Sequence, residues 1–452
     1  MPQAKSTHSA GSGPPAPSRA PHQHAKVPLD ARIPVSFFAV GVLFFVLGVS
    51  LLPFAVNRID QYFYQAIPLA VVHVFTLGWI TAVIMGVMYR YVPALTRTAL
   101  PSPRLAWIQL ALYVVGASGM ITHFAIGIWP GLWLAAIIVF VSILMFACNI
   151  LPGVMGQVGR GVAETGMFLS VCFLIAAALL GTLLGLDKTY DFLGGSLLTN
   201  LAAHVHLAAV GWVTLSICAV SYRMLPAFLL PTIQLPAAAK WQIYALAMTV
   251  VGLVASLLLR SGIAATFAIA ISLCMVWYVV IVAGMVRTLR RPLDWTPLHA
   301  LAGVICLAMA AGLGIALSFA GGDSALGARL APAYGAMGLL GFFSNFIVGM
   351  SYQLFPGFVA RARTSARRAA VTIAEISITR TRLFVFLTSN GGVLLLAGGF
   401  IENAVHIAQL GAALIAVAGL VYSAVTLWTL SFAFRDSIPR AARETTLRIL
   451  PE

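Results

Sequence analysis

Residues 201–226 read LAAHVHLAAVGWVTLSICAVSYRMLP, and this stretch decides the fold. It is apolar enough to cross a bilayer, which takes about 20 residues at a rise of about 1.5 Å each. It nevertheless carries two histidines, His204 and His206, near its start. An ionisable side chain at membrane depth is costly unless it serves a purpose, so we expect a functional site here.

The same pattern occurs three times in the chain. The copy that begins at His73 reads HVFTLGWITAVIMGVMYRYVP, and the copy that begins at His206 reads HLAAVGWVTLSICAVSYRMLP. The third copy, AMGLLGFFSNFIVGMSYQLFP, begins at Ala336 in place of histidine. The copies begin 133 and then 130 residues apart. A repeat of this kind indicates three related structural units.

Three positions recur in every copy and carry local expectations. The glycine five residues on predicts a close approach between helices. The tyrosine sixteen residues on is expected in the aromatic belt at the inner membrane face, and the proline twenty residues on is expected to end the helix. We expect the tryptophans of the first two copies to pack between helices.

The composition identifies the class of protein. Hydrophobic residues make up 61% of the 452 residues and charged residues only 9%, which excludes an ordinary soluble protein. We predict an all-α, polytopic membrane protein with twelve transmembrane helices in three pseudo-symmetric groups of four. The repeated stretch forms the second span of each group. The predicted spans are 33–56, 67–89, 106–126, 130–151, 162–185, 197–224, 240–260, 264–286, 297–320, 333–355, 383–401 and 404–434.

These spans are predicted to form a single membrane domain over 33–436, flanked by two tails. Residues 1–32 are rich in Pro, Ala and Ser and too polar to fold, so we predict a disordered cytoplasmic tail. Residues 437–452 are predicted to be a second cytoplasmic tail. Within the membrane domain, the three repeats are expected at 33–155, 160–291 and 297–436.

Basic residues predict the orientation. With the N-terminus in the cytoplasm, 23 of the 27 Lys and Arg residues fall on the cytoplasmic side of the predicted spans, as the positive-inside rule requires. We therefore predict an integral protein of a bacterial inner membrane with both termini in the cytoplasm. The net charge of +15 then reflects topology and attraction to anionic lipid, so the predicted partner is a lipid bilayer and not nucleic acid.

Histidines gather in the outer third of the predicted membrane domain. His73 lies in the second span, and His204 and His206 lie at a similar depth in the sixth. His123 ends the third span and His406 begins the twelfth. Such a cluster favours a haem or metal site, because neutral imidazole binds iron or copper without bringing charge into lipid. The alternative is that each histidine hydrogen-bonds a neighbouring helix.

The spacing of His204 and His206 limits what they can do together. Two residues on a helix are turned by about 200°, so these imidazoles cannot chelate one ion as a pair. They can address two cofactors, or one cofactor and one neighbouring helix. His299, in DWTPLHA, is expected at the membrane interface. The chain has no paired cysteines and no GxxxxGK[ST], GxGxxG or HExxH pattern, which leaves zinc and nucleotide chemistry without support.

At this point the residues carry a family resemblance. AHVHLAAVGW at 203–212, followed by SYRMLP at 221–226, resembles the tenth span of haem–copper oxidase subunit I, especially the C-family (cbb-type) cytochrome oxidases. In that family an HxH pair ligates one haem from each face of the helix, and the second span carries a low-spin haem ligand. The resemblance implies haem b between His73 and His206, with His204 as a further cofactor ligand and copper as a second candidate cofactor.

The chain also departs from that family. Its HxH lies in the sixth span instead of the tenth, and the tenth span has Ala336 at the matching position. The seventh span, WQIYALAMTVVGLVASLLLR, has no histidine for the family's copper site, and no acidic residue lies at mid-membrane to start a proton channel. The sequence therefore resembles a divergent, non-pumping relative, similar in architecture to the NnrS-type membrane proteins, which also have twelve spans and haem.

Three classes of function follow. The first is a haem-binding membrane protein without a complete copper site, acting in electron transfer, haem or copper handling, or the response to nitric oxide or oxygen, and not primarily an enzyme. The second is an atypical terminal oxidase or nitric oxide reductase-like enzyme, in which His204, His123 or His406 helps to build a second metal site. The third is a cofactor-free transporter or assembly factor. A redox partner or another membrane subunit is expected for the first two.

Overall fold

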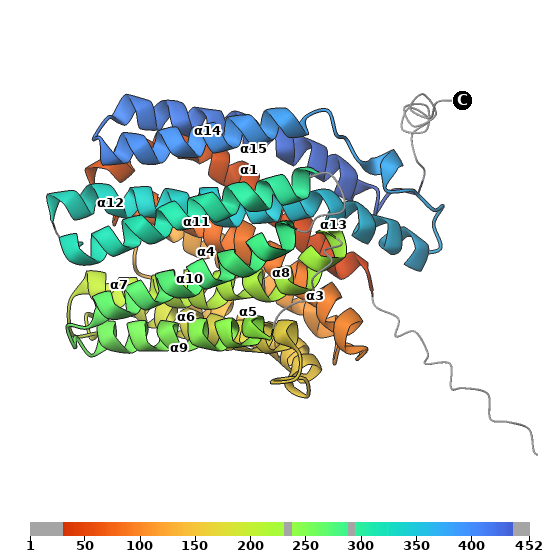
Figure 1. Cartoon of the computed structure of the whole chain (residues 1–452), viewed down its shortest axis with the longest axis horizontal. Coiled ribbons are helices and arrows are strands. Elements are labelled where there is room, and N and C mark those ends of the chain that lie inside the picture. Colours follow the sequence, from red (N-terminus) through yellow and green to blue (C-terminus); the bar gives the residue numbers. More distant parts are fainter. Residues whose placement is uncertain (1–29, 230–236, 288–293, 323, 437–452) are drawn as a thin grey trace, which may run out of the picture.

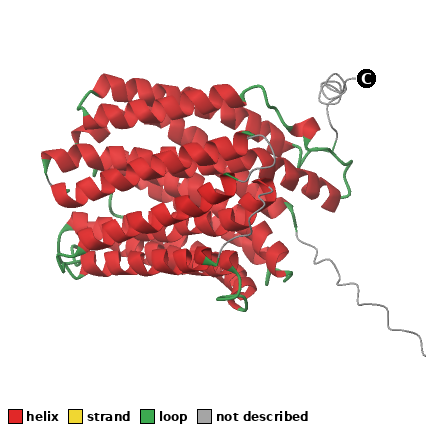
Figure 2. Cartoon of the chain, in the orientation of Figure 1, coloured by secondary structure: helices red, strands yellow, loops and turns green. Residues whose placement is uncertain are grey.

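A computed structural model describes residues 30–229, 237–287, 294–322 and 324–436. Over these residues it contains twelve helical segments long and apolar enough to cross a membrane, and no strand. This confirms the predicted all-α fold with twelve spans. The helices run side by side, with the loops gathered at the two ends of the bundle (Figure 2). The predicted tail at 437–452 and nearly all of the one at 1–32 lie outside the described residues.

Nine of the spans are single α-helices on the outside of the bundle. Between 22% and 50% of their apolar windows are buried, against 67% to 72% for the other three spans. The bilayer core offers the backbone no hydrogen-bonding partners. Each spanning segment is therefore a helix that satisfies its own backbone N–H and C=O groups and presents apolar side chains to lipid. These helices are α1 (Arg32–Gln61), α4 (Pro103–Ile126), α5 (Leu132–Met155), α6 (Val162–Tyr190), α9 (Ala238–Leu258), α10 (Ala264–Val286), α11 (Trp295–Ala320), α14 (Arg382–Ile401) and α15 (Val405–Ser431).

The three inner spans are the repeated stretches, and each is interrupted by a π-helical turn. The turns begin directly after His73, His206 and Ala336. In two of them the hydroxyl of Thr214 or Ser344 donates to the carbonyl oxygen five residues earlier, at 2.8 Å in both cases. The inner spans are α2–η1–α3 (Ala66–His73, Val74–Thr81, Ala82–Thr96), α7–η2–α8 (Leu197–His206, Leu207–Thr214, Leu215–Leu229) and α12–η3–α13 (Ala325–Ala336, Met337–Phe343, Ser344–Ser365).

The recurring glycine brings each inner span against the span before it, as predicted. A β-carbon at this position would overlap a side chain of α1, α6 or α11, so only glycine allows the contact. An added β-carbon would lie 2.5 Å from Phe44 at Gly78, 2.6 Å from Phe173 at Gly211 and 2.8 Å from Cys306 at Gly341. Equivalent contacts in all three repeats support the predicted three-fold pseudo-symmetry.

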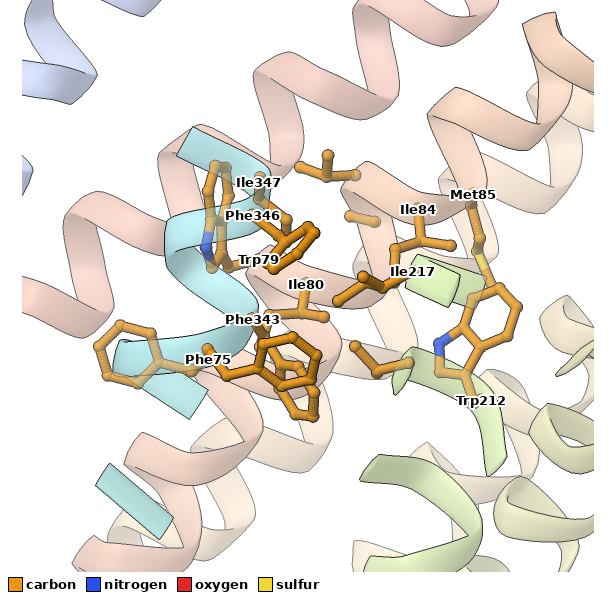
Figure 3. Close-up of a cluster of buried hydrophobic side chains, with 14 of the residues drawn as sticks. Phe75, Trp79, Ile80, Ile84, Met85, Trp212, Ile217, Phe343, Phe346 and Ile347 are labelled. Carbon is orange, nitrogen blue, oxygen red and sulfur yellow. The ribbon is translucent and has the colours of Figure 1, made fainter. Parts of the chain in front are cut away.

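The outer helices close a ring around the inner spans. In Figure 1 the N-terminal α1 lies beside the C-terminal α15, and the two helices pack along each other. At the centre, aromatic and aliphatic side chains from all three inner spans meet (Figure 3). Trp79 and Trp212 are 0% and 1% exposed, which confirms that they pack between helices. The Trp212 indole donates to the Thr81 hydroxyl at 3.1 Å and so joins two repeats.

Two expectations about the ends of the inner spans were wrong. The prolines expected to end these helices, Pro93, Pro226 and Pro356, lie inside α3, α8 and α13. Proline removes one donor, and membrane helices tolerate this because neighbouring groups satisfy the freed carbonyl. The three helices therefore continue past the repeat before they end.

The recurring tyrosines also differ from expectation, because two of them lie in the core and not in an interfacial belt. Tyr89 and Tyr222 are 0% and 2% exposed. Their hydroxyls donate to the side-chain oxygens of Gln109 at 3.3 Å and Gln242 at 3.0 Å. A buried phenol needs such a partner. Each glutamine follows its tyrosine by twenty residues, a second repeat signal that the sequence contains.

Candidate functional site

His73 and His206 occupy the same position in two repeats, the last residue before the π turn. The Nδ1 of each ring hydrogen-bonds the carbonyl oxygen four residues earlier, Leu69 or Ala202, at 2.7 Å. A carbonyl oxygen can only accept, so Nδ1 carries a proton, and in the neutral ring Nε2 keeps its lone pair. Both side chains are half-buried. In its neutral form, each imidazole therefore has Nε2 available to bind a metal.

His204 is held in the same tautomer by a neighbouring span. Its Nδ1 donates to the carbonyl oxygen of Ala177 on α6 at 3.0 Å, which again leaves Nε2 with a lone pair. Gly181, one turn further along α6, faces the ring closely. A β-carbon there would lie 2.7 Å from the Cε1 atom of His204. The position of this imidazole is thus set by a glycine and a carbonyl on one face of α6.

His204 and His206 face different neighbours, as their angular separation predicts. His204 lies within electrostatic range of His73 in the first repeat. The His206 ring lies 6.4 Å from the Tyr334 ring of the third repeat, with an angle of 24° between the planes. Tyr334 stands two residues before Ala336, as His204 stands two before His206. His204 and Tyr334 therefore occupy equivalent positions in the second and third repeats.

This arrangement bears on the pairing that the resemblance implied. The sequence predicted His73 and His206 on opposite sides of one haem. The ring contact described for His206 is with Tyr334 of α12, and the pairing of His73 with His206 stays a prediction. Sequence spacing could not assign these neighbours, because it gives the angle between two side chains on a helix but not which span each one faces.

Aromatic residues and one cation surround the junction of the first two repeats. The Phe124 ring stacks on His73 with 4.6 Å between ring centroids. At the same end of the bundle, the Lys188 ammonium lies 4.5 Å from the ring centre of Tyr64 and 4.4 Å from that of Trp129. Cation–π contacts of this kind hold an ammonium group in a defined place. The junction thus combines apolar walls with a positive charge near its end.

The remaining predicted metal ligands lie at helix ends, His123 in the last turn of α4 and His406 in the first turn of α15. The Nδ1 of His123 donates to the carbonyl oxygen of Ile128 at 3.0 Å. His406 is exposed, with its Nδ1 3.4 Å from the side-chain oxygen of Gln409. Within the described residues no three or more His, Cys, Asp or Glu side chains form a group that could hold a metal ion. The roles of His123 and His406 as metal ligands, and copper itself, stay predictions.

His299 contradicts the expectation that it lies at the interface. It is 1% exposed, and its Nδ1 donates to the Asn345 side-chain oxygen at 2.8 Å. The sequence did contain a signal for this partner. The third repeat has a polar Asn345 where the other two have Ala82 and Leu215, and a buried amide requires a hydrogen-bonding partner.

Neither a protein-family model nor a curated protein matches this chain.

Proposed function

We propose that the chain is a haem-binding integral membrane protein in which His73 and His204 are the axial ligands of one haem b. The observation that supports this most is the junction of the first two repeats. There, two imidazoles from different spans lie within electrostatic range of each other. Each has Nδ1 tied to a carbonyl oxygen, which in the neutral ring leaves Nε2 with its lone pair. Histidine ligands in metal sites use this second-shell hydrogen bond to fix the ring and raise its basicity.

The residues around the junction fit a haem. A porphyrin buries a large apolar surface, and Phe124 offers an aromatic wall beside His73. The haem carboxylates require positive charge, and Lys188 supplies an ammonium group at this end of the bundle. The carbonyl oxygens of Leu69 and Ala177 would orient the two imidazoles. A bound haem of this type supplies one-electron redox chemistry.

His73 and His204 would both hold the haem, so neither imidazole would be free to act on a substrate. The proposed site therefore favours electron transfer, haem handling or a sensing role over turnover. We place this function in a bacterial inner membrane with both termini in the cytoplasm, as the distribution of basic residues favours. A redox partner or another membrane subunit would then exchange electrons with the haem.

A second candidate function is an atypical oxidase or nitric oxide reductase-like enzyme. The observation that favours it is the other junction, where His206 faces Tyr334 and not a second histidine. Of this pair, only His206 would hold a haem there, and the haem would supply chemistry toward a small substrate. Measuring oxygen and nitric oxide consumption by the purified protein separates this function from the first.

The experiment that tests the proposal is visible absorption of the purified protein, compared with His73→Ala, His204→Ala and His206→Ala. We expect a b-type spectrum in the wild type that is lost in the first two variants and kept in His206→Ala. Loss in His206→Ala together with retention in His204→Ala would instead support the pairing of His73 with His206. Absence of haem from wild-type protein, purified from haem-supplied cells, would refute the proposal and favour a cofactor-free scaffold.

A further inference from the structure

The third repeat contains a cavity with a mostly apolar wall. Its volume is about 30 Å³. Four spans each contribute at least one polar side chain to this wall, beside apolar residues that include Phe45 of α1. These polar side chains are His299 of α11, Ser344 and Asn345 of α13, Ser389 of α14 and Tyr422 of α15.

Hydrogen bonds fix the His299 ring in this wall. The amide nitrogen of Asn345 donates to the Gly341 carbonyl oxygen at 2.6 Å and to the Asn390 side-chain oxygen at 2.8 Å. The amide oxygen of Asn345 must therefore face His299, and it accepts from Nδ1 at 2.8 Å. Nε2 is left as an acceptor, and no described protein group donates to it although the ring is 1% exposed. A buried acceptor without a donor is unfavourable.

The other polar groups of the wall are acceptors too. The hydroxyls of Ser344 and Ser389 donate to backbone carbonyl oxygens, Leu339 at 2.8 Å and Phe386 at 3.4 Å. The Tyr422 hydroxyl donates to another hydroxyl, that of Ser351, at 2.9 Å. Each donor proton is thus engaged, and each oxygen keeps a lone pair. The cavity selects a small molecule that donates hydrogen bonds.

Size and charge narrow the choice of molecule. A buried water needs about 10–15 Å³ on this measure, so the cavity has room for roughly two. Two waters supply four hydrogen-bond donors. The wall has four free acceptors, which are His299 Nε2 and the hydroxyl oxygens of Ser344, Ser389 and Tyr422. A cation with several donors is disfavoured, because the Arg382 charge acts on His299. Arg382 lies over the Tyr352 ring at 4.6 Å, and that ring lies 5.6 Å from the His299 ring.

We propose that this cavity is a buried hydration site, in which enclosed water donates a hydrogen bond to His299 Nε2. Such water satisfies a group that the protein alone leaves unpaired, which is the usual role of buried water. It also gives one imidazole of the third repeat contact with water inside the membrane domain, with Tyr352 and Arg382 between it and the end of the bundle. The inference does not depend on haem.

Water-edited solid-state NMR of the ¹⁵N-histidine-labelled protein in lipid tests this proposal. His299→Gln identifies the His299 signal among the nine histidines, and the exposed His406 is the positive control. We expect magnetisation transfer from water to both rings in the wild type. Transfer to His406 without transfer to His299 would overturn the proposal.

A cavity-filling variant provides the matched control. Ala418 is 0% exposed and lines the cavity, so Ala418→Leu adds three carbon atoms where the water is proposed to lie. We expect transfer to His299 to be lost in this variant and transfer to His406 to be unchanged. Persistent transfer to His299 in a folded Ala418→Leu protein would show that the water reaches the ring by another route and would contradict the assigned site.

Discussion

The glycine that faces His204 provides a sharp test of the proposed ligand. In Gly181→Ala the new methyl carbon would lie 2.7 Å from the ring Cε1 and 3.2 Å from Nδ1. Carbon atoms in contact are normally about 3.5–4.0 Å apart, so the ring has to move by about 1 Å. That movement breaks or lengthens the 3.0 Å hydrogen bond from Nδ1 to Ala177. The substitution thus perturbs the imidazole without removing it.

The expected size of the effect follows from the second-shell role of that bond. Loss of such a partner typically costs about 10–100-fold in metal affinity. The helix itself should not suffer, because alanine is favoured over glycine in a helix interior by about 1 kcal/mol. Gly185 lies one turn further on α6, and a β-carbon there would be 3.8 Å from the nearest atom, Ala136 Cβ. Gly185→Ala is therefore the matched control.

The assay is haem content per chain after purification in detergent, with circular dichroism to verify the helical fold. We expect Gly185→Ala to keep the wild-type content and Gly181→Ala to lose most of it at limiting haem. Equal haem content in two folded variants would refute the reasoning that His204 needs this position to bind iron.

Two further predictions compare equivalent residues of different repeats. Tyr222→Phe should lower the free energy of unfolding by about 1–3 kcal/mol, because the Gln242 side-chain oxygen loses its donor in the core; Tyr352→Phe should change it far less, since the Tyr352 hydroxyl has no partner among the described residues. Denaturation in mixed micelles measures the free energy of unfolding of both variants. Equal decreases would contradict the hydrogen bond assigned to Tyr222. Trp212→Phe should lower the free energy of unfolding by about 1 kcal/mol more than Trp79→Phe does in the same assay. The reason is that, of these two indoles, only that of Trp212 has a described hydrogen-bond partner. A larger loss for Trp79→Phe would contradict this.

Hydropathy and the internal repeat were enough to predict the number of spans and their grouping, because a bilayer imposes length and composition on every helix. The repeat also identified the glycines that allow close packing. Prolines misled the prediction of helix ends, because proline removes a helix donor but is tolerated within membrane helices. The helices continue past Pro93 and Pro226.

The residues of the candidate site and the pairing of its histidines both stay predictions. The histidines of two repeats were evident from their shared register, and the π turns that follow them were not, because no residue pattern distinguishes a π turn from an α turn here. His299 was missed for a related reason. Its partner Asn345 lies 46 residues away, and a lone polar residue in an apolar span does not indicate which helix it faces.

The reduction potential and absorption spectrum of His204→Met, set beside those of the wild type, test the central claim most directly. Methionine also binds haem iron, and replacing a histidine ligand by methionine raises the reduction potential of the haem. We predict that the variant keeps its haem at a higher potential with an altered spectrum. An identical potential and spectrum would contradict the assignment of His204 as an axial ligand.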